Sequence, residues 1–154
     1  MKGNPTIRQD HAAAQADFAA ALEDLFRAVL RVSGRGVPGG DTELTLSQYW
    51  VMAALAGDPL TVSDVARAAQ IAVPSATRAL RALERRGFVE RRRDTGEDGR
   101  LVRVGLTRKG RTVLDEKQSW VSSRQREIFD ALSLAERRTA ARTLDAITAG
   151  IVDL

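Results

Sequence analysis

The chain has 154 residues, 44% of them hydrophobic and 29% charged, which is enough for one folded domain with a buried core. It contains no cysteine, which excludes a disulfide framework, a thiolate zinc site and a thiol redox switch. No apolar run approaches the roughly 20 residues of a membrane span. Residues 1–15 also lack the apolar core of a signal peptide, so we expect a cytoplasmic protein.

The net charge of +4 is distributed unevenly along the chain. Residues 78–111 hold twelve Arg and Lys against five Asp and Glu, a net charge of +7, whereas the rest of the chain carries −3. A basic block of this kind is typical of a surface that binds a polyanion. A solvated arginine-rich surface gives the same count, so charge alone leaves both interpretations open.

A long N-terminal helix is predicted over about residues 10–31, because apolar side chains recur there at steps of three or four. A glycine-rich loop at residues 33–40 ends it. Capping signals of the form Thr-x-x-Gln and Thr-x-x-Asp then open two short helices, at residues 45–55 and 62–69. A third short helix, at residues 73–86, has a proline in its first turn and a glycine directly after its end.

A β-hairpin is predicted next, with strands at residues 88–92 and 101–106 around a polar turn at residues 94–99. Helical periodicity returns at residues 108–132 and again from residue 134 onward. The predicted fold is therefore mainly α with one small β-hairpin.

The order of three short helices followed by a hairpin is that of a winged helix-turn-helix, a motif that places the N-terminus of its second helix in the DNA major groove. That helix begins at Val73. Arginine bonds guanine or phosphate there, and the first backbone amides favour a phosphate. The candidate DNA-contacting residues are Pro74, Ser75, Thr77, Arg78 and Arg81. The alternative is an amphipathic helix whose outer face is merely basic.

The hairpin would serve as the wing, because a polar tip and cationic stem suit a segment that follows DNA. The candidate contacts are Arg93, Asp98, Arg100 and Arg103, with Asp98 orienting Arg100 rather than facing a phosphate. For residues 91–93 a charged edge strand is an equally good interpretation.

A catalytic function is not expected. The single histidine, His11, and the lack of cysteine leave little for a nucleophile–histidine arrangement. The sequence has no HExxH, Walker or GxGxxG motif, and its carboxylates are scattered among arginines as in ion pairs. We expect no catalytic residues, no metal ligands and no cofactor.

Five segments in order resemble the MarR family (multiple antibiotic resistance regulators). The family's second and third helices are matched by residues 44–55 and 60–66, and its recognition helix with the entry to its wing by residues 77–91. Asp98-Gly99-Arg100 occupies the family's Asp-x-Arg position in the wing, and residues 106–111 resemble the start of its fifth helix.

The sequence departs from the family pattern in three places. Ala72 stands where a capping serine is common, Gly99 replaces a common basic residue, and the wing is one residue longer than usual. These departures affect the expected wing contacts rather than the fold.

The resemblance implies a homodimeric repressor that binds a pseudo-palindromic double-stranded DNA operator. Residues 10–32 and 108–154 would form the dimerisation helices, and residues 45–107 the winged helix-turn-helix domain. The apolar faces of the terminal helices independently favour dimerisation, since one small winged domain would not bury them. Packing within one chain is the alternative. The expected interface residues are Phe18, Leu22, Leu25, Leu144, Ile147 and Ile151.

The resemblance also implies a small phenolic or otherwise aromatic ligand that releases the repressor from DNA. Its cleft would lie between the dimerisation helices and the winged domain, and the candidate lining residues are His11, Tyr49, Trp50 and Trp120. Ordinary core packing is the alternative for each of them. Two other functions stay open, a winged helix that binds proteins and a regulator of a sister family such as the PadR-like repressors.

Overall fold

The computed structural model describes residues 5–33, 35–93 and 102–152. Within these residues the elements, in chain order, are α1 (Pro5–Ser33), α2 (Leu46–Ala54), α3 (Val62–Ala68), α4 (Val73–Arg85), β1 (Val89–Arg93), β2 (Val102–Leu106), α5 (Arg108–Ala131) and α6 (Leu134–Val152). None of these helices has the length and apolar character needed to cross a membrane.

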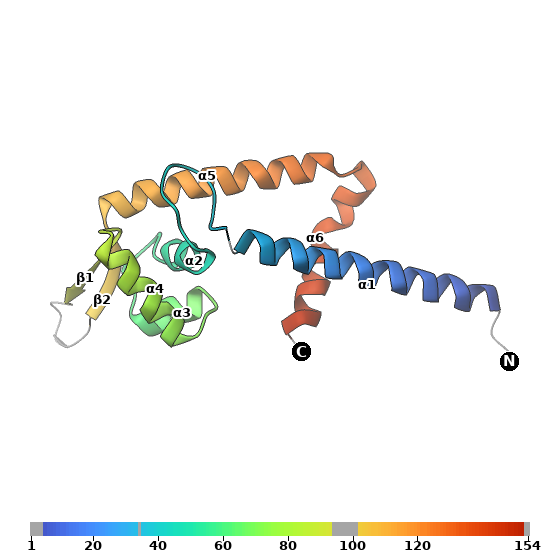
Figure 1. Cartoon of the computed structure of the whole chain (residues 1–154), viewed down its shortest axis with the longest axis horizontal. Helices are drawn as coiled ribbons and strands as arrows, with labels where there is room; N and C mark the ends of the chain where they lie inside the picture. The colour runs from blue at the N-terminus through green and yellow to red at the C-terminus, as the bar shows by residue number, and fades with distance from the viewer. Residues whose placement is uncertain (1–4, 34, 94–101, 153–154) are drawn as a thin grey trace.

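The molecule is elongated, with a folded unit at one end and long helices leading away from it (Figure 1). The folded unit, called the winged domain below, consists of α2, α3, α4 and the β1–β2 hairpin. Helix α5 runs from this domain toward α6, which turns back and crosses α1. We call α1 and α6 the outer helices.

The predicted fold class is confirmed, because the structure is mainly helical with one antiparallel hairpin. In the hairpin, Val89 lies opposite Leu106 and Arg93 opposite Val102. Leu60, from the loop between α2 and α3, forms an isolated bridge with Val104 through two backbone hydrogen bonds of 2.8 and 2.9 Å. This bridge attaches the second strand to the helices of the winged domain.

The first strand begins at Val89 rather than at Phe88, where the sequence places it. Gly87 has a φ of +73°, and its N–H donates to Glu84 O while the Phe88 N–H donates to Leu83 O. These two hydrogen bonds form a Schellman motif, which needs glycine at the left-handed position. Phe88 therefore belongs to the end of α4. Its N–H is already bonded to Leu83 O, so the strand starts one residue later.

The helix starts follow the capping signals in the sequence. Thr45 and Gln48 form the reciprocal hydrogen bonds of a capping box at α2. Thr61 accepts a hydrogen bond from the Asp64 N–H at α3. Helix α4 has Ala72 at its N-cap and no side-chain cap, as its sequence indicates. A helix without such a cap leaves more of its first N–H groups available to a partner.

The core of the winged domain lies where α2, α3, α4, the hairpin and the first half of α5 meet. The face of α4 toward this core consists of small and branched apolar residues that are buried: Ala76, Ala79, Leu80 and Leu83. Val65 and Ala66 of α3 are buried too, and Ala69 and Ile71 are partly buried against the same core. This packing fixes which face of α4 is left to solvent.

The outer helices show the opposite pattern, with large apolar side chains exposed in the single chain. Phe18 on α1 is 53% exposed and Leu144 on α6 is 57% exposed. An apolar hollow of about 440 Å³ lies where the two helices cross, and its lining includes Phe18, Leu22, Phe26, Ile147 and Ile151. Exposed apolar surface of this extent usually marks an interface.

Candidate nucleic-acid interface

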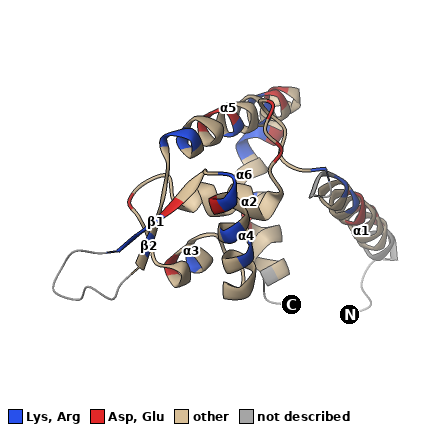
Figure 2. Cartoon of the chain, turned by 60° about the vertical axis from the view of Figure 1, so that its left-hand side comes forward, with Lys and Arg blue, Asp and Glu red and all other residues tan. Residues whose placement is uncertain are grey.

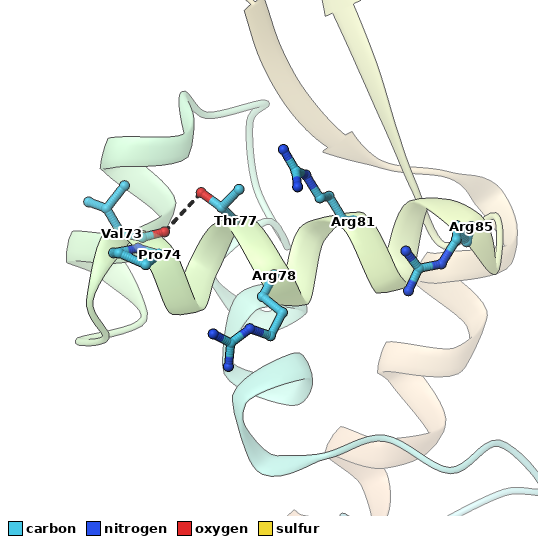
Figure 3. Close-up of a pocket in the computed structure, with 6 residues that line it drawn as sticks. All are labelled: Val73, Pro74, Thr77, Arg78, Arg81 and Arg85. Atoms are coloured by element: carbon cyan, nitrogen blue, oxygen red, sulfur yellow. Dashed lines mark hydrogen bonds between the residues drawn. The ribbon is translucent and has the colours of Figure 1, made fainter.

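The exposed face of α4 forms a shallow basic hollow of about 560 Å³ (Figure 3). Three arginines, at positions 78, 81 and 85, recur along the helix at steps of three and four, so they share the face opposite the buried one. The full lining is Val73, Pro74, Thr77, Arg78, Arg81 and Arg85. Four of the five residues predicted on this helix thus line one hollow.

Ser75, the fifth predicted residue, lies in an adjoining hollow of about 410 Å³ between α2 and α4. Arg78 lines this hollow as well, together with Thr45, Ser47 and Gln48 from the start of α2. Arg78 therefore stands between the two hollows and belongs to both.

Thr77 has its hydroxyl engaged by its own helix. Its Oγ1 donates a hydrogen bond of 2.9 Å to Val73 O, one turn earlier (Figure 3). The hydroxyl therefore has a fixed orientation on the exposed face of α4.

The arginines of the basic hollow differ from those of the hairpin in their partners. Arg78, Arg81 and Arg85 have no ion pair with a carboxylate within the described part of the chain. By contrast, Arg91 is 3.2 Å from Glu84, and Arg92 is paired with Glu90. Basic residues lie on α4 and along β1 (Figure 2), and two of the three β1 arginines, Arg91 and Arg92, are already paired with carboxylates. On α4, an anionic partner would therefore not compete with carboxylates for Arg78, Arg81 and Arg85.

Sequence reasoning missed Arg85, which lines the same hollow as Arg78. The signal was present, because Arg78 and Arg85 are seven residues apart, or nearly two helical turns.

The predicted wing residues have different settings. Arg93 is exposed at the end of β1. Arg103 is half-buried, and its Nη1 donates to Pro59 O at 3.4 Å, which turns part of its guanidinium toward the loop before α3. Asp98 and Arg100 lie outside the described residues. The ion pairs of Arg91 and Arg92 fit a charged strand edge.

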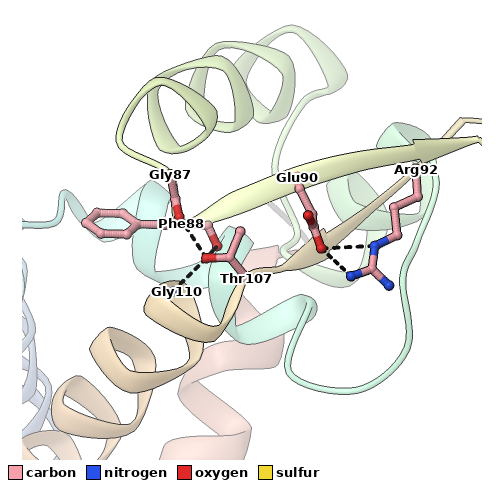
Figure 4. A network of polar contacts seen from close by, with 6 residues as sticks. All are labelled: Gly87, Phe88, Glu90, Arg92, Thr107 and Gly110. Carbon is pink, nitrogen blue, oxygen red and sulfur yellow. Dashed lines mark hydrogen bonds and ion pairs between the residues drawn. The ribbon is translucent and has the colours of Figure 1, made fainter.

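A hydrogen-bonded corner holds α4, β1 and α5 together (Figure 4). Thr107, the N-cap of α5, donates to Gly87 O at 2.7 Å and accepts from the Gly110 N–H at 3.0 Å. The Thr107 N–H also donates to Phe88 O at 3.0 Å. Gly110 lies so close to this corner that a Cβ there would be 1.9 Å from Phe88 O. The end of α4 is therefore tied directly to the first turn of α5.

A family model described as MarR family matches residues 42–101, which cover α2, α3, α4 and the first strand of the hairpin. This segment is thus similar to the MarR family of winged helix-turn-helix proteins. The match, together with DNA complexes among the structural neighbours, supports a DNA-binding transcriptional regulator. The chain matches no curated protein sequence.

Solved structures of MarR-type regulators share the fold of most of the chain. FabT of Streptococcus pneumoniae in complex with DNA is 21% identical, covers 92% of this chain and 98% of its own, and has a TM-score of 0.68. BpsR of Bordetella bronchiseptica is 23% identical over 86% of this chain and 98% of its own, with a TM-score of 0.66. MepR of S. aureus in complex with DNA is 26% identical over 70% and 80%, with a TM-score of 0.61.

The four residues predicted to line a ligand cleft have different settings in the described part of the chain, although the Tyr49 and Trp50 rings contact each other edge to face with centroids 5.0 Å apart. Tyr49 is 6% exposed in the core of the winged domain, and burial raises the pKa of its phenol. Trp50 is half exposed beside the end of α3, whereas Trp120 lies against Gly39. His11 is exposed in the first half of α1.

Proposed function

We propose that the protein is a homodimeric repressor whose two α4 helices enter successive major grooves of a pseudo-palindromic operator. The observation that carries this proposal is the exposed face of α4, where Arg78, Arg81 and Arg85 lack carboxylate partners in the described residues. Unpaired arginines that project from a helix over its exposed face suit contacts to guanine and phosphate.

The assignment of individual contacts follows from position on this face. Pro74, Ser75, Thr77 and Arg78 belong to the N-terminal half of α4, which is the part that approaches base edges in this motif. Arg81 and Arg85 lie farther along the same face and suit phosphates at the groove margin.

The wing would contribute the second part of the interface. Arg93 supports a contact beside the groove because it is exposed at the end of its strand. Asp98 and Arg100 stay predictions from the sequence, with Arg100 reaching the minor groove. Arg103 shares its guanidinium with Pro59 O, so any contact to DNA uses its remaining N–H groups.

Dimerisation through the outer helices is supported by their exposed apolar residues. The proposed interface comprises Phe18, Leu22, Leu25, Leu144, Ile147 and Ile151, within the dimerisation segments 10–32 and 108–154. The first half of α5 buries Val113 and Leu114 against the winged domain, residues 45–107, so α5 would join the two parts. A second copy would cover the apolar surface that the single chain leaves open.

A small aromatic ligand is the proposed signal that releases the operator. The BpsR structure is described as showing the regulation of DNA binding by 6-hydroxynicotinic acid, a small aromatic acid. Trp50 and Trp120 are partly exposed in this chain and offer aromatic surface for such a compound. Titration with salicylate-like compounds, followed by tryptophan fluorescence, tests this part. No saturable change at millimolar concentration would contradict it.

Selection of DNA sequences from a random pool by the full-length protein tests the main proposal, in about 0.1 M salt where nonspecific binding is moderated. The expected result is a two-fold-symmetric site bound much more tightly than bulk DNA. Binding without sequence preference would contradict the proposal. Repression is then tested by placing the selected site over a reporter promoter.

A further inference from the structure

The chain buries one charged side chain within its described residues, that of Lys117 on α5, which is 1% exposed. Its Nζ donates a hydrogen bond to Gly39 O, in the segment of residues 35–44 that joins α1 to α2. We call this segment the strap, because it arches over α5 (Figure 1). Lys117 thus joins two segments that are distant in sequence.

The strap has a defined conformation over α5. The Val37 N–H donates to Leu44 O at 2.7 Å, and both side chains are buried. Gly39 has a φ of +101°, and a Cβ at this position would lie 2.8 Å from the Trp120 Cβ and 3.2 Å from Glu116 O. Only glycine permits both this backbone conformation and this close approach. The strap therefore lies directly against α5 at the point where Lys117 binds it.

The burial of Lys117 is chemically unusual, since an ammonium group loses its hydration when it is covered. Burial lowers the pKa of Lys117, and the nearby Arg86 lowers it too, whereas Glu116 and Glu43 raise it. No carboxylate lies within ion-pair distance of its Nζ in the described residues, so a backbone carbonyl is its defined partner. A buried charged contact of this kind adds little to the free energy of unfolding, and its main effect is to hold the strap in one position on α5.

The chain connects the winged domain to the outer helices through two segments, namely the strap, which leads to α1, and α5, which leads to α6. The first half of α5 is already packed on the winged domain, through the Thr107 corner and the buried Val113 and Leu114. The strap needs a second fastening, because it leads to α1 and would otherwise let the outer helices shift relative to the domain. Lys117 and Gly39 form the point at which the strap and α5 are fastened.

We propose that Lys117 is a positioning residue that sets the orientation of α4 relative to the outer helices and so determines which spacing of operator half-sites the protein accepts. This inference rests on the proposed homodimer and its two-fold operator. In such a dimer, half-site spacing mirrors the separation and tilt of the two recognition helices. A swivelling domain would reach several spacings, and a fixed one would reach a single spacing.

The test uses the full-length protein and the operator that the wild type selects, with its half-sites moved apart or together by one base pair. The wild type is expected to lose at least about tenfold in affinity on the shifted operators, because simultaneous engagement of both half-sites fails. Lys117→Met removes the donor but keeps an apolar stem of similar length, and it is expected to reduce this discrimination to about threefold or less. Affinity for a single half-site should not change.

Gly39→Ala disturbs the same contact from the strap side and should reproduce the loss of spacing discrimination. Gly57→Ala is the matched control, since a Cβ at Gly57 has no neighbour within 4 Å.

Unchanged discrimination in both Lys117→Met and Gly39→Ala overturns the inference but leaves the proposed function intact. Unfolding of both variants, judged by circular dichroism, also overturns it, because the contact is then structural. A wild type indifferent to half-site spacing contradicts both proposals.

Discussion

The hydroxyl of Thr107 donates a 2.7 Å hydrogen bond to the carbonyl oxygen of Gly87, so the residue that caps α5 also holds the residue that ends α4. The recognition helix and the helix that leads to the dimer region are therefore joined at one corner. Movement of α5 must pass to α4 through this corner or break it.

Replacement of Thr107 by valine should lower the free energy of unfolding by about 1 kcal/mol, because the N-cap acceptor and the donor to Gly87 are both lost. Urea unfolding followed by circular dichroism measures the change. Thr107→Ser is the control, since it keeps the hydroxyl and should remain close to the wild type. An equal loss in Thr107→Ser, which keeps the hydroxyl, would contradict the assignment of the effect to the two hydrogen bonds of that hydroxyl.

Gly110→Ala should be more damaging than Thr107→Val. The new Cβ would lie 1.9 Å from Phe88 O and 2.8 Å from its carbonyl carbon, and this backbone cannot move without displacing the corner. We expect a loss of about 3 kcal/mol or more, at the upper end for overpacked sites. Gly57→Ala serves as the control in the same unfolding series. A Gly110→Ala protein of wild-type stability would mean that α5 is not held this closely to α4.

Alanine at Arg78 and at Arg85 should weaken operator binding in different ways. Arg78→Ala is expected to cost about 1–3 kcal/mol and to relax base preference at one position of each half-site. Arg85→Ala should weaken binding to all sequences alike and reduce the slope of log K against log salt by about one per protomer. Fluorescence anisotropy over a salt series separates the two effects.

Arg124→Ala provides the charge-matched control for this series, because Arg124 is exposed on α5 and already paired with Glu127. Its salt slope should equal that of the wild type. If neither Arg78→Ala nor Arg85→Ala changed the affinity for the operator, α4 would not be part of the DNA interface. Arg100→Ala extends the same series to the wing, where weaker binding is expected without loss of the dimer.

Leu144→Glu should dissociate the dimer, because a carboxylate placed on the exposed apolar surface of α6 would have to be buried against the partner. Sedimentation equilibrium is expected to show a monomer at concentrations where the wild type is dimeric. Binding to a single half-site should persist, whereas the gain from the second half-site should vanish. A variant that stays dimeric would place the interface elsewhere.

Stability should fall in acid through Asp64. A hydrogen bond from Thr61 is the largest influence and lowers the pKa of this carboxyl, and the nearby Arg67 charge lowers it too, against an opposing effect of desolvation. Because the folded-state pKa lies below the unfolded one, the contribution is full above the unfolded pKa, about 3.9. It is lost as the pH falls through the folded value. Thr61→Val should move the Asp64 pKa, measured by carboxyl NMR titration, back toward its ordinary value. An unchanged pKa would exclude the Thr61 hydrogen bond as the cause.

Local signals predicted most of the winged domain. The Thr45 capping box, the glycine at the end of α4 and the alternation in β2 each act within a few residues, so the sequence displays them directly. The exposed face of α4 was predicted for the same reason, because helical spacing alone places Arg78 and Arg81 together. Element bounds agree with the predictions to within a residue or two, apart from an earlier start of α1 at Pro5.

The features that escaped prediction depend on contacts between distant segments. Lys117 has a polar side chain at a helix position that the sequence cannot mark as buried, because its partner Gly39 lies far away along the chain. Trp120 could not be placed against the strap for the same reason. The sequence also suggested one cleft for Tyr49, Trp50 and Trp120, since composition alone does not separate a core ring from a surface ring.

The hydrogen bond from Thr77 to Val73 O has a consequence for the bases that α4 reads. With its proton committed to the helix, the Thr77 oxygen has only lone pairs to offer, and its methyl group is the remaining contact. In a major groove such a side chain accepts from the amino group of adenine or cytosine, or touches the thymine methyl. The guanine edge offers only acceptors in that groove, so Thr77 favours half-site positions other than guanine on the strand it faces.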